Sequence, residues 1–203
     1  DRYVGGRSDK AGVQHHDRTK PNFILFSCAE SIVSQNIGKR DGPLANHVFH
    51  NVAHCMIDGY NDYYRETPAW LEEGLGHYYE RREDPRWNNF CWAEGKMPQQ
   101  FTKPDWETTI FSLIRRDRDT PFAQWCEKLQ PGELSGVENG FTWGIVKWLV
   151  ETEPLRFTKM IEPMDDLTLN LDSAGMIQQS FGCSPSVLYQ RWREYALENY
   201  VTK

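Results

Sequence analysis

The sequence lacks any apolar run that approaches the roughly 20 residues needed to cross a bilayer as a helix. It also lacks an excess of basic charge, since 29 acidic residues against 23 lysines and arginines give a net charge of −6. Proteins that bind nucleic acid usually carry a basic stripe. We therefore expect a chain without a transmembrane segment whose partner is neither DNA nor RNA.

The five cysteines contain no pair with CxxC spacing. The usual zinc-ribbon arrangement is therefore excluded, and the scattered positions define no disulfide framework. An odd number of cysteines leaves at least one thiol free within the chain. Disulfide pairing and the redox compartment stay open at this point.

The 203 residues suit one well-cored domain and are few for two. A composition of 39% hydrophobic and 26% charged residues is that of an ordinary globular protein. We expect a single α+β domain over residues 1–203 that is mostly helical. Its predicted parts are a small β-containing region (1–42), a pair of helices (43–83) and a helical C-terminal part (84–203).

Periodicity and capping residues locate the expected elements. The run Phe23–Phe26 predicts a strand, and Leu44, Val48, Val52 and Met56 recur every four residues in a helix that starts near Pro43. Three hydroxyl–proline pairs predict further helix starts, because a capping side chain precedes a proline at the first helical position; they are Thr67-Pro68, Thr120-Pro121 and Ser184-Pro185. Other helices are expected at 104–116, 140–152, 154–162 and 172–180, with a long loop over 84–104.

Two histidines on the first predicted helix are candidates for metal ligands. His50 and His54 lie four residues apart, so both imidazoles project from one helix face and can hold one ion. Zinc needs a third protein ligand and, in a catalytic site, keeps a fourth position open. Glu73 is the best candidate, because the eighteen residues between His54 and Glu73 leave room for a turn and a second helix. Alone, two histidines at this spacing more often belong to the surface or the core.

This pattern resembles the gluzincin (peptidase-MA-like) clan of zinc metallopeptidases. The resemblance rests on HxxxH, an eighteen-residue gap and a glutamate inside W-L-x-E-G-x-x-x-Y, here residues 70–78. Residues 141–149 and 181–195 are similar to later helices of such domains, so the likeness spans residues 20–200. It implies a zincin-like fold with His50, His54 and Glu73 as zinc ligands. It also favours a secreted, periplasmic or cell-envelope location.

Two departures fall on positions that carry catalysis in this clan. The residue after the first histidine is a glutamate there and acts as general base; here it is Asn51, whose amide cannot take up a proton at neutral pH. Many members have an oxyanion-stabilising tyrosine where alignment on Gly144 places Phe141. Loss of a general base costs about 10²–10⁴-fold, and loss of an oxyanion donor costs about 10²–10³-fold. The resemblance thus implies a degenerate peptidase.

Two further residues are candidates to brace the zinc ligands. Where thermolysin-like members have a carboxylate one turn after the glutamate ligand, this chain has His77, whose neutral ring could accept from a ligand N–H. Asp58 follows His54 by four residues and either braces that ligand or ends the helix. Glu72, next to the third ligand, is expected to point elsewhere, although it could serve as a substitute base.

Three hypotheses for function follow. The first is a degenerate zinc metallopeptidase-like protein that keeps its metal site and binds a peptide or a partner protein. The second is an active metallohydrolase in which another carboxylate, such as Glu72 or one from a partner, replaces the lost base. The third is a metal-free structural or interaction module. The sequence names no substrate, partner or oligomeric state.

Overall fold

The computed structural model describes residues 15–16, 24–25, 41–60, 66–88, 90, 94–166, 168–169 and 172–200. Two short strands, β1 (His15–His16) and β2 (Ile24–Leu25), pair antiparallel with His15 opposite Leu25. Ile24 and Leu25 fall within the strand expected at 23–26. Apart from these four residues, the predicted β-containing region up to residue 40 lies outside the described residues.

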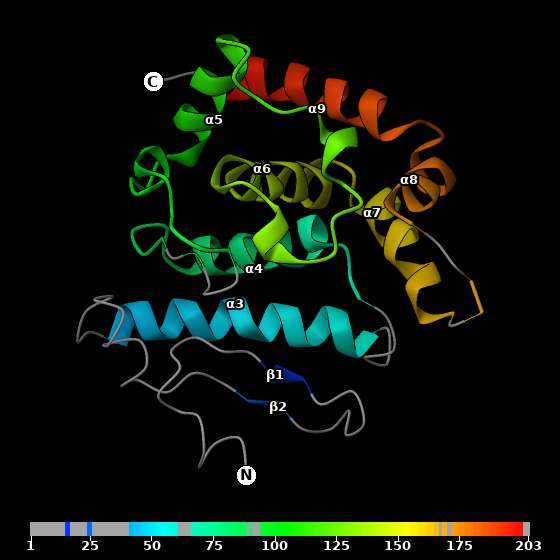
Figure 1. The fold of residues 1–203 in the computed structure, drawn as a ribbon, viewed down its shortest axis with the longest axis horizontal. Coiled ribbons are helices and arrows are strands. Elements are labelled where there is room, and N and C mark those ends of the chain that lie inside the picture. The colour runs from blue at the N-terminus through cyan, green and yellow to red at the C-terminus, as the bar shows by residue number, and fades with distance from the viewer. Residues whose placement is uncertain are drawn as a thin grey trace.

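The remainder of the described chain is mostly helical, as predicted (Figure 1). The α-helices are α3 (Asp41–Tyr60), α4 (Ala69–Glu83), α5 (Trp106–Arg115), α6 (Gly136–Thr152), α7 (Pro154–Ile161), α8 (Ser173–Phe181) and α9 (Pro185–Asn199). Short 3-10 turns η1 (Gln99–Phe101), η2 (Phe122–Gln124), η3 (Pro131–Glu133) and η4 (Glu162–Asp165) interrupt the connections. None of the helices in the described part is both long and apolar enough to cross a membrane.

Helix α4 lies between α3 and α6 (Figure 1). Helix α6 contacts α5 and α9 on its other sides, and α7 and α8 pack at one end. Gly74 explains the close approach of α4 to α6, because an added Cβ would lie 2.4 Å from Val146 Cγ2 and 2.8 Å from the carbonyl oxygen of Thr142. The core of this assembly is rich in fully buried aromatic side chains, among them Trp70, Trp106, Trp125, Phe141 and Trp192.

The three helix starts predicted from hydroxyl–proline pairs have different outcomes in the structure. Ser184 caps α9 by accepting from the amide of Val187 at 3.4 Å, and Pro185 is its first residue, as expected. At Thr67-Pro68 the helix begins at Ala69 and Thr67 does not cap it, since its hydroxyl donates to Asp58 at 3.0 Å.

The prediction of a helix at Thr120-Pro121 is wrong, because only the 3-10 turn η2 forms there. Phe122 and Trp125 both turn into the core, and the Trp125 indole donates to the carbonyl of Thr120 at 3.0 Å. Pro131 soon opens another short turn, so no long helix fits the segment. Helix α6 starts four residues earlier than expected, because Ser135 and Glu138 form a capping box.

Helix α3 buries a polar face and exposes much of its apolar one. The buried side chains include His47, His50, Asn51 and His54, alongside Ala53, Cys55 and Ile57. The exposed ones are Val48, Phe49, Val52, Met56 and Tyr60, with Met56 at 68% exposure. The regular apolar spacing therefore predicted the helix correctly, but the face that meets α4 is the one that carries the histidines.

Candidate metal centre

The structure brings the three predicted ligands together between α3 and α4. His50 Nε2 lies 3.2 Å from Glu73 Oε2, and His54 Nε2 lies 3.6 Å from the same oxygen. The two imidazole rings are 4.5 Å apart between centroids. All three residues are buried, with 1%, 4% and 0% of their surface exposed. These residues form a group whose donor atoms are close enough to hold one metal ion.

Gly76 allows this convergence. A Cβ at Gly76 would lie 2.8 Å from both His50 Cε1 and His54 Nε2. Any side chain at this position on α4 would therefore push into both rings. The absence of a side chain lets α4 carry Glu73 up against the two imidazoles of α3.

The donor set fits zinc. A tetrahedral ion with bonds of about 2.05 Å places its ligand atoms about 3.3 Å apart, close to the observed 3.2 and 3.6 Å. The Nε2 atoms of His50 and His54 are buried, and among the described residues neither makes a hydrogen bond of good geometry, although both face Oε2 of Glu73. Such buried polar atoms are costly unless something binds them. Two imidazole nitrogens and one carboxylate oxygen form a common zinc ligand set.

A carboxylate braces each candidate histidine ligand. His50 Nδ1 donates to Glu80 Oε2 at 2.9 Å, and His54 Nδ1 lies 3.1 Å from Glu72 Oε1. A carboxylate on Nδ1 holds the proton there and leaves the Nε2 lone pair for the metal. The expectation that Glu72 points elsewhere is therefore wrong. Glu80, which sequence reasoning missed, follows Glu73 by seven residues and so shares its face of α4.

His77 lies in the same cluster. Its ring meets His50 edge-on at 4.9 Å, and its Nε2 lies 2.8 Å from Glu94 Oε1. Its Nδ1 lies 3.5 Å from Glu80 Oε1. The side chain that braces His50 is thus the Glu80 carboxylate. The His77 ring packs against the His50 ring instead. Glu94 comes from the long predicted loop and had no motif to indicate it.

The other candidate residues lie apart from the three ligands in their described contacts. Asn51 is buried next to His50, and its side-chain amide donates to the carbonyl of His47 at 2.8 Å. Phe141 is fully buried on α6 and packs edge-to-face on Trp192 of α9 at 5.5 Å. Asp58 accepts from the Thr67 hydroxyl.

Electrostatics among the three candidate ligands favour an ionised Glu73 and protonated imidazoles in the metal-free chain. Burial lowers the pKa of His50, but contacts with Glu73 and Glu80 outweigh it and raise this pKa. Burial opposes the charge of His54 too, yet Glu73 and Glu72 raise its pKa well above the ordinary value. Burial likewise works against an ionised Glu73, and the neighbouring imidazoles of His54 and His50 nevertheless hold its pKa far below normal. In the metal-free chain, protons on the imidazoles supply the positive charge that a bound cation would otherwise supply.

The pKa values of the outer residues of the cluster shift in different directions. Burial lowers the pKa of His77, but Glu94 and Glu80 raise it to about 10. Burial and the nearby charge of Glu73 raise the pKa of Glu94. For His47, burial and the neighbouring His50 lower the pKa to about 4, so this imidazole is neutral at pH 7.

No family model, curated protein or solved structure matches this chain. A metal centre is therefore indicated by the buried histidine and glutamate side chains alone.

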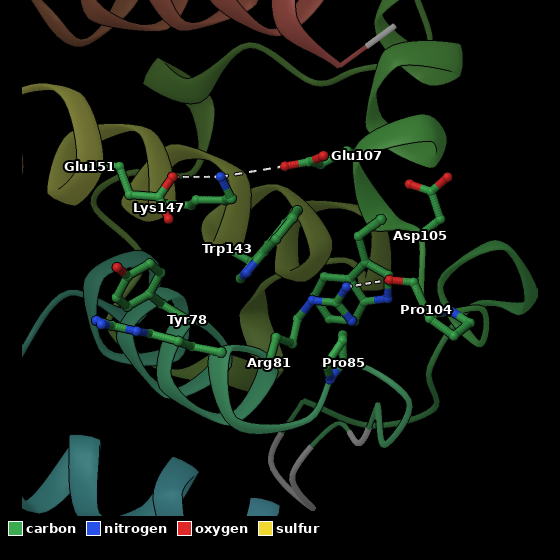
Figure 2. Close-up of a pocket in the computed structure, with 11 residues that line it drawn as sticks. Tyr78, Arg81, Pro85, Pro104, Asp105, Glu107, Trp143, Lys147 and Glu151 are labelled. Carbon is green, nitrogen blue, oxygen red and sulfur yellow. Dashed lines mark hydrogen bonds and ion pairs between the residues drawn. The ribbon is translucent and has the colours of Figure 1, made fainter. Parts of the chain in front are cut away.

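A separate pocket of about 240 Å³ lies between α4, α5 and α6 (Figure 2). Arg81 lies over the Trp106 ring at 4.1 Å and donates to the carbonyl of Pro104 at 2.5 Å. Lys147 is held between Glu107, at 3.4 Å, and Glu151, at 2.6 Å. These two cations bind partners within the molecule itself, and the histidine cluster does not line this pocket.

Proposed function

We propose that this chain is a degenerate zinc metallopeptidase-like protein of the gluzincin type. In this proposal His50, His54 and Glu73 hold zinc, and the protein acts by binding a peptide or a partner protein rather than by hydrolysis. The buried Nε2 atoms that converge on the Glu73 carboxylate are the observation that carries it. When bound, zinc would supply a Lewis acid and a fixed positive charge at the junction of α3 and α4.

The loss of hydrolysis is argued from Asn51. Its side-chain amide donates to the backbone of its own helix, and an amide has no proton-accepting form at neutral pH. The aromatic ring of Phe141 packs on Trp192 and has no hydroxyl with which to stabilise an oxyanion. Since general-base catalysis contributes about 10²–10⁴-fold, such a site would be a very poor peptidase.

An active hydrolase with a substitute base is the second hypothesis. Glu72 was its first candidate, but Glu72 lies on Nδ1 of His54, on the far side of the ring from the metal-facing Nε2. Its position suits bracing rather than proton transfer at the metal. The net charge of −6 supports a partner other than nucleic acid.

Metal content and proteolysis test the proposal together. Protein purified without chelator should contain at least about one equivalent of zinc, which His50→Ala should remove. The unmodified chain should leave a peptide library intact. Asn51→Glu should gain weak hydrolysis at best, because Phe141 still lacks a hydroxyl group. Asn51→Gln is the matched control, since it has the length of glutamate without its carboxylate.

Two outcomes would redirect the proposal. Hydrolysis by the unmodified chain that His50→Ala abolishes would establish an active enzyme and overturn the loss of catalysis. Zinc below about a tenth of an equivalent would favour the third hypothesis, a metal-free interaction module.

A further inference from the structure

We propose that Glu73, His77 and Glu94 form a second cation site beside the one formed by His50, His54 and Glu73. This inference rests on the proposed function, because it takes the first site to hold a metal ion. The three residues form a group whose donor atoms lie within 4.8 Å of one another. They are buried, with 0%, 0% and 5% of their surfaces exposed. His77 and Glu94 belong to α4 and the following loop, so this set needs no ligand from α3.

The two sites can be filled at the same time because they share one carboxylate. Glu73 has two oxygens, and Oε2 is the one that faces His50 and His54. Carboxylates commonly join two metal ions in this way in two-metal sites. A third possible group, of His50, His77 and Glu80, competes with the first for His50. Its Glu80 already accepts from His50 Nδ1 at 2.9 Å, so this group fits bracing better than metal binding.

Glu80 stands in a similar relation to both histidines. One of its oxygens lies 2.9 Å from His50 Nδ1 and the other lies 3.5 Å from His77 Nδ1. In each ring Nε2 therefore lies on the side away from Glu80. It faces Glu73 in His50 and Glu94 in His77. A metal-binding histidine usually has a carboxylate on the ring nitrogen opposite the metal; in His77 the nitrogen that would face the ion contacts Glu94 at 2.8 Å in the metal-free chain.

Charge balance supports a second cation. Four carboxylates converge on the cluster, and each is buried or nearly so: Glu72, Glu73, Glu80 and Glu94. Buried charges are costly unless they are compensated. If all four carboxylates are ionised and the histidines are neutral, one divalent cation balances only two of the negative charges. A second balances the remaining two and leaves no net charge to be carried by protons.

The donor set indicates the kind of ion. One imidazole and two carboxylates suit zinc, and their oxygen-rich character also suits manganese. Zinc is the simplest probe, because a single ion type can then fill both sites.

Zinc stoichiometry tests the inference on the full chain. The protein is stripped with a chelator, saturated with zinc chloride and passed over a desalting column before metal analysis. We expect about two equivalents in the unmodified chain and about one in Glu94→Gln or His77→Gln. Glu83→Gln, an exposed position on α4, is the matched control and should keep two.

The outcomes separate this inference from the proposed function. If the unmodified chain and Glu94→Gln both bind one equivalent while His54→Ala binds none, the second site is refuted and the proposed function stands. No zinc in any of them would refute both.

A spectroscopic readout on the unmodified chain covers the case in which Glu94→Gln fails to fold. Two cobalt ions that share the Glu73 carboxylate should couple magnetically, so the second equivalent should alter the signal of the first. Independent, additive signals would overturn the shared site.

Discussion

Replacing Glu80 by glutamine should weaken zinc binding about 100-fold, or about 2.7 kcal/mol. Bracing carboxylates contribute about 10–100-fold to metal affinity, and Glu80 should lie at the upper end for two reasons. It is 1% exposed, so water cannot replace it, and it faces the Nδ1 atoms of both His50 and His77. Glutamine keeps the shape and one acceptor but removes the charge.

Glu72→Gln should cost less, about tenfold. Its side chain is 16% exposed and contacts only His54 among the cluster histidines in its described contacts, at 3.1 Å. The zinc dissociation constant of each variant is measured by competition with a chromophoric chelator at fixed pH, with Glu83→Gln on the exposed face of α4 as control. A change below about threefold for Glu80→Gln, or a larger loss for Glu72→Gln, would refute the bracing argument.

Two further predictions concern the packing and the protonation of the site. Gly76→Ala should lower zinc affinity by more than about tenfold, because its Cβ would lie 2.8 Å from both His50 and His54; unchanged affinity in the chelator competition would contradict the close approach. Zinc uptake near pH 7 should release protons, because the pKa values of His50 and His54 are raised in the metal-free chain, and affinity should therefore rise with pH. Calorimetry in buffers of different ionisation enthalpy counts these protons, and an enthalpy independent of the buffer would show that none is released.

The sequence was sufficient to predict that His50, His54 and Glu73 meet. Spacing of four residues on a helix determines which side chains share a face, and the gap before Glu73 fits a helix pair. Glu80 could have been found by the same rule, because seven residues from Glu73 is about two helical turns. The resemblance to the gluzincin clan instead put the bracing position at residue 77, which is a histidine in this chain.

Glu94 could not have been predicted. It belongs to the connection after α4, and the path of an irregular segment depends on tertiary packing rather than on a local period. The face of α3 that packs against α4 could not be predicted either, because periodicity identifies an amphipathic helix without showing what its polar face contacts. Thr120-Pro121 was misleading for a similar reason: a capping pair permits a helix, but the following Phe122 and Trp125 pack into the core from a 3-10 turn.

Buried imidazoles and carboxylates lie between helices α3 and α4, alongside apolar side chains of both helices. Excluding water from such groups gains little free energy until their charges are neutralised. In the proposed zinc-bound protein, withdrawal of the cation should therefore loosen α3 before it disturbs the aromatic core around α6. Under this proposal, the attachment of one helix to the rest of the molecule would depend on the ionic composition of the surrounding solution.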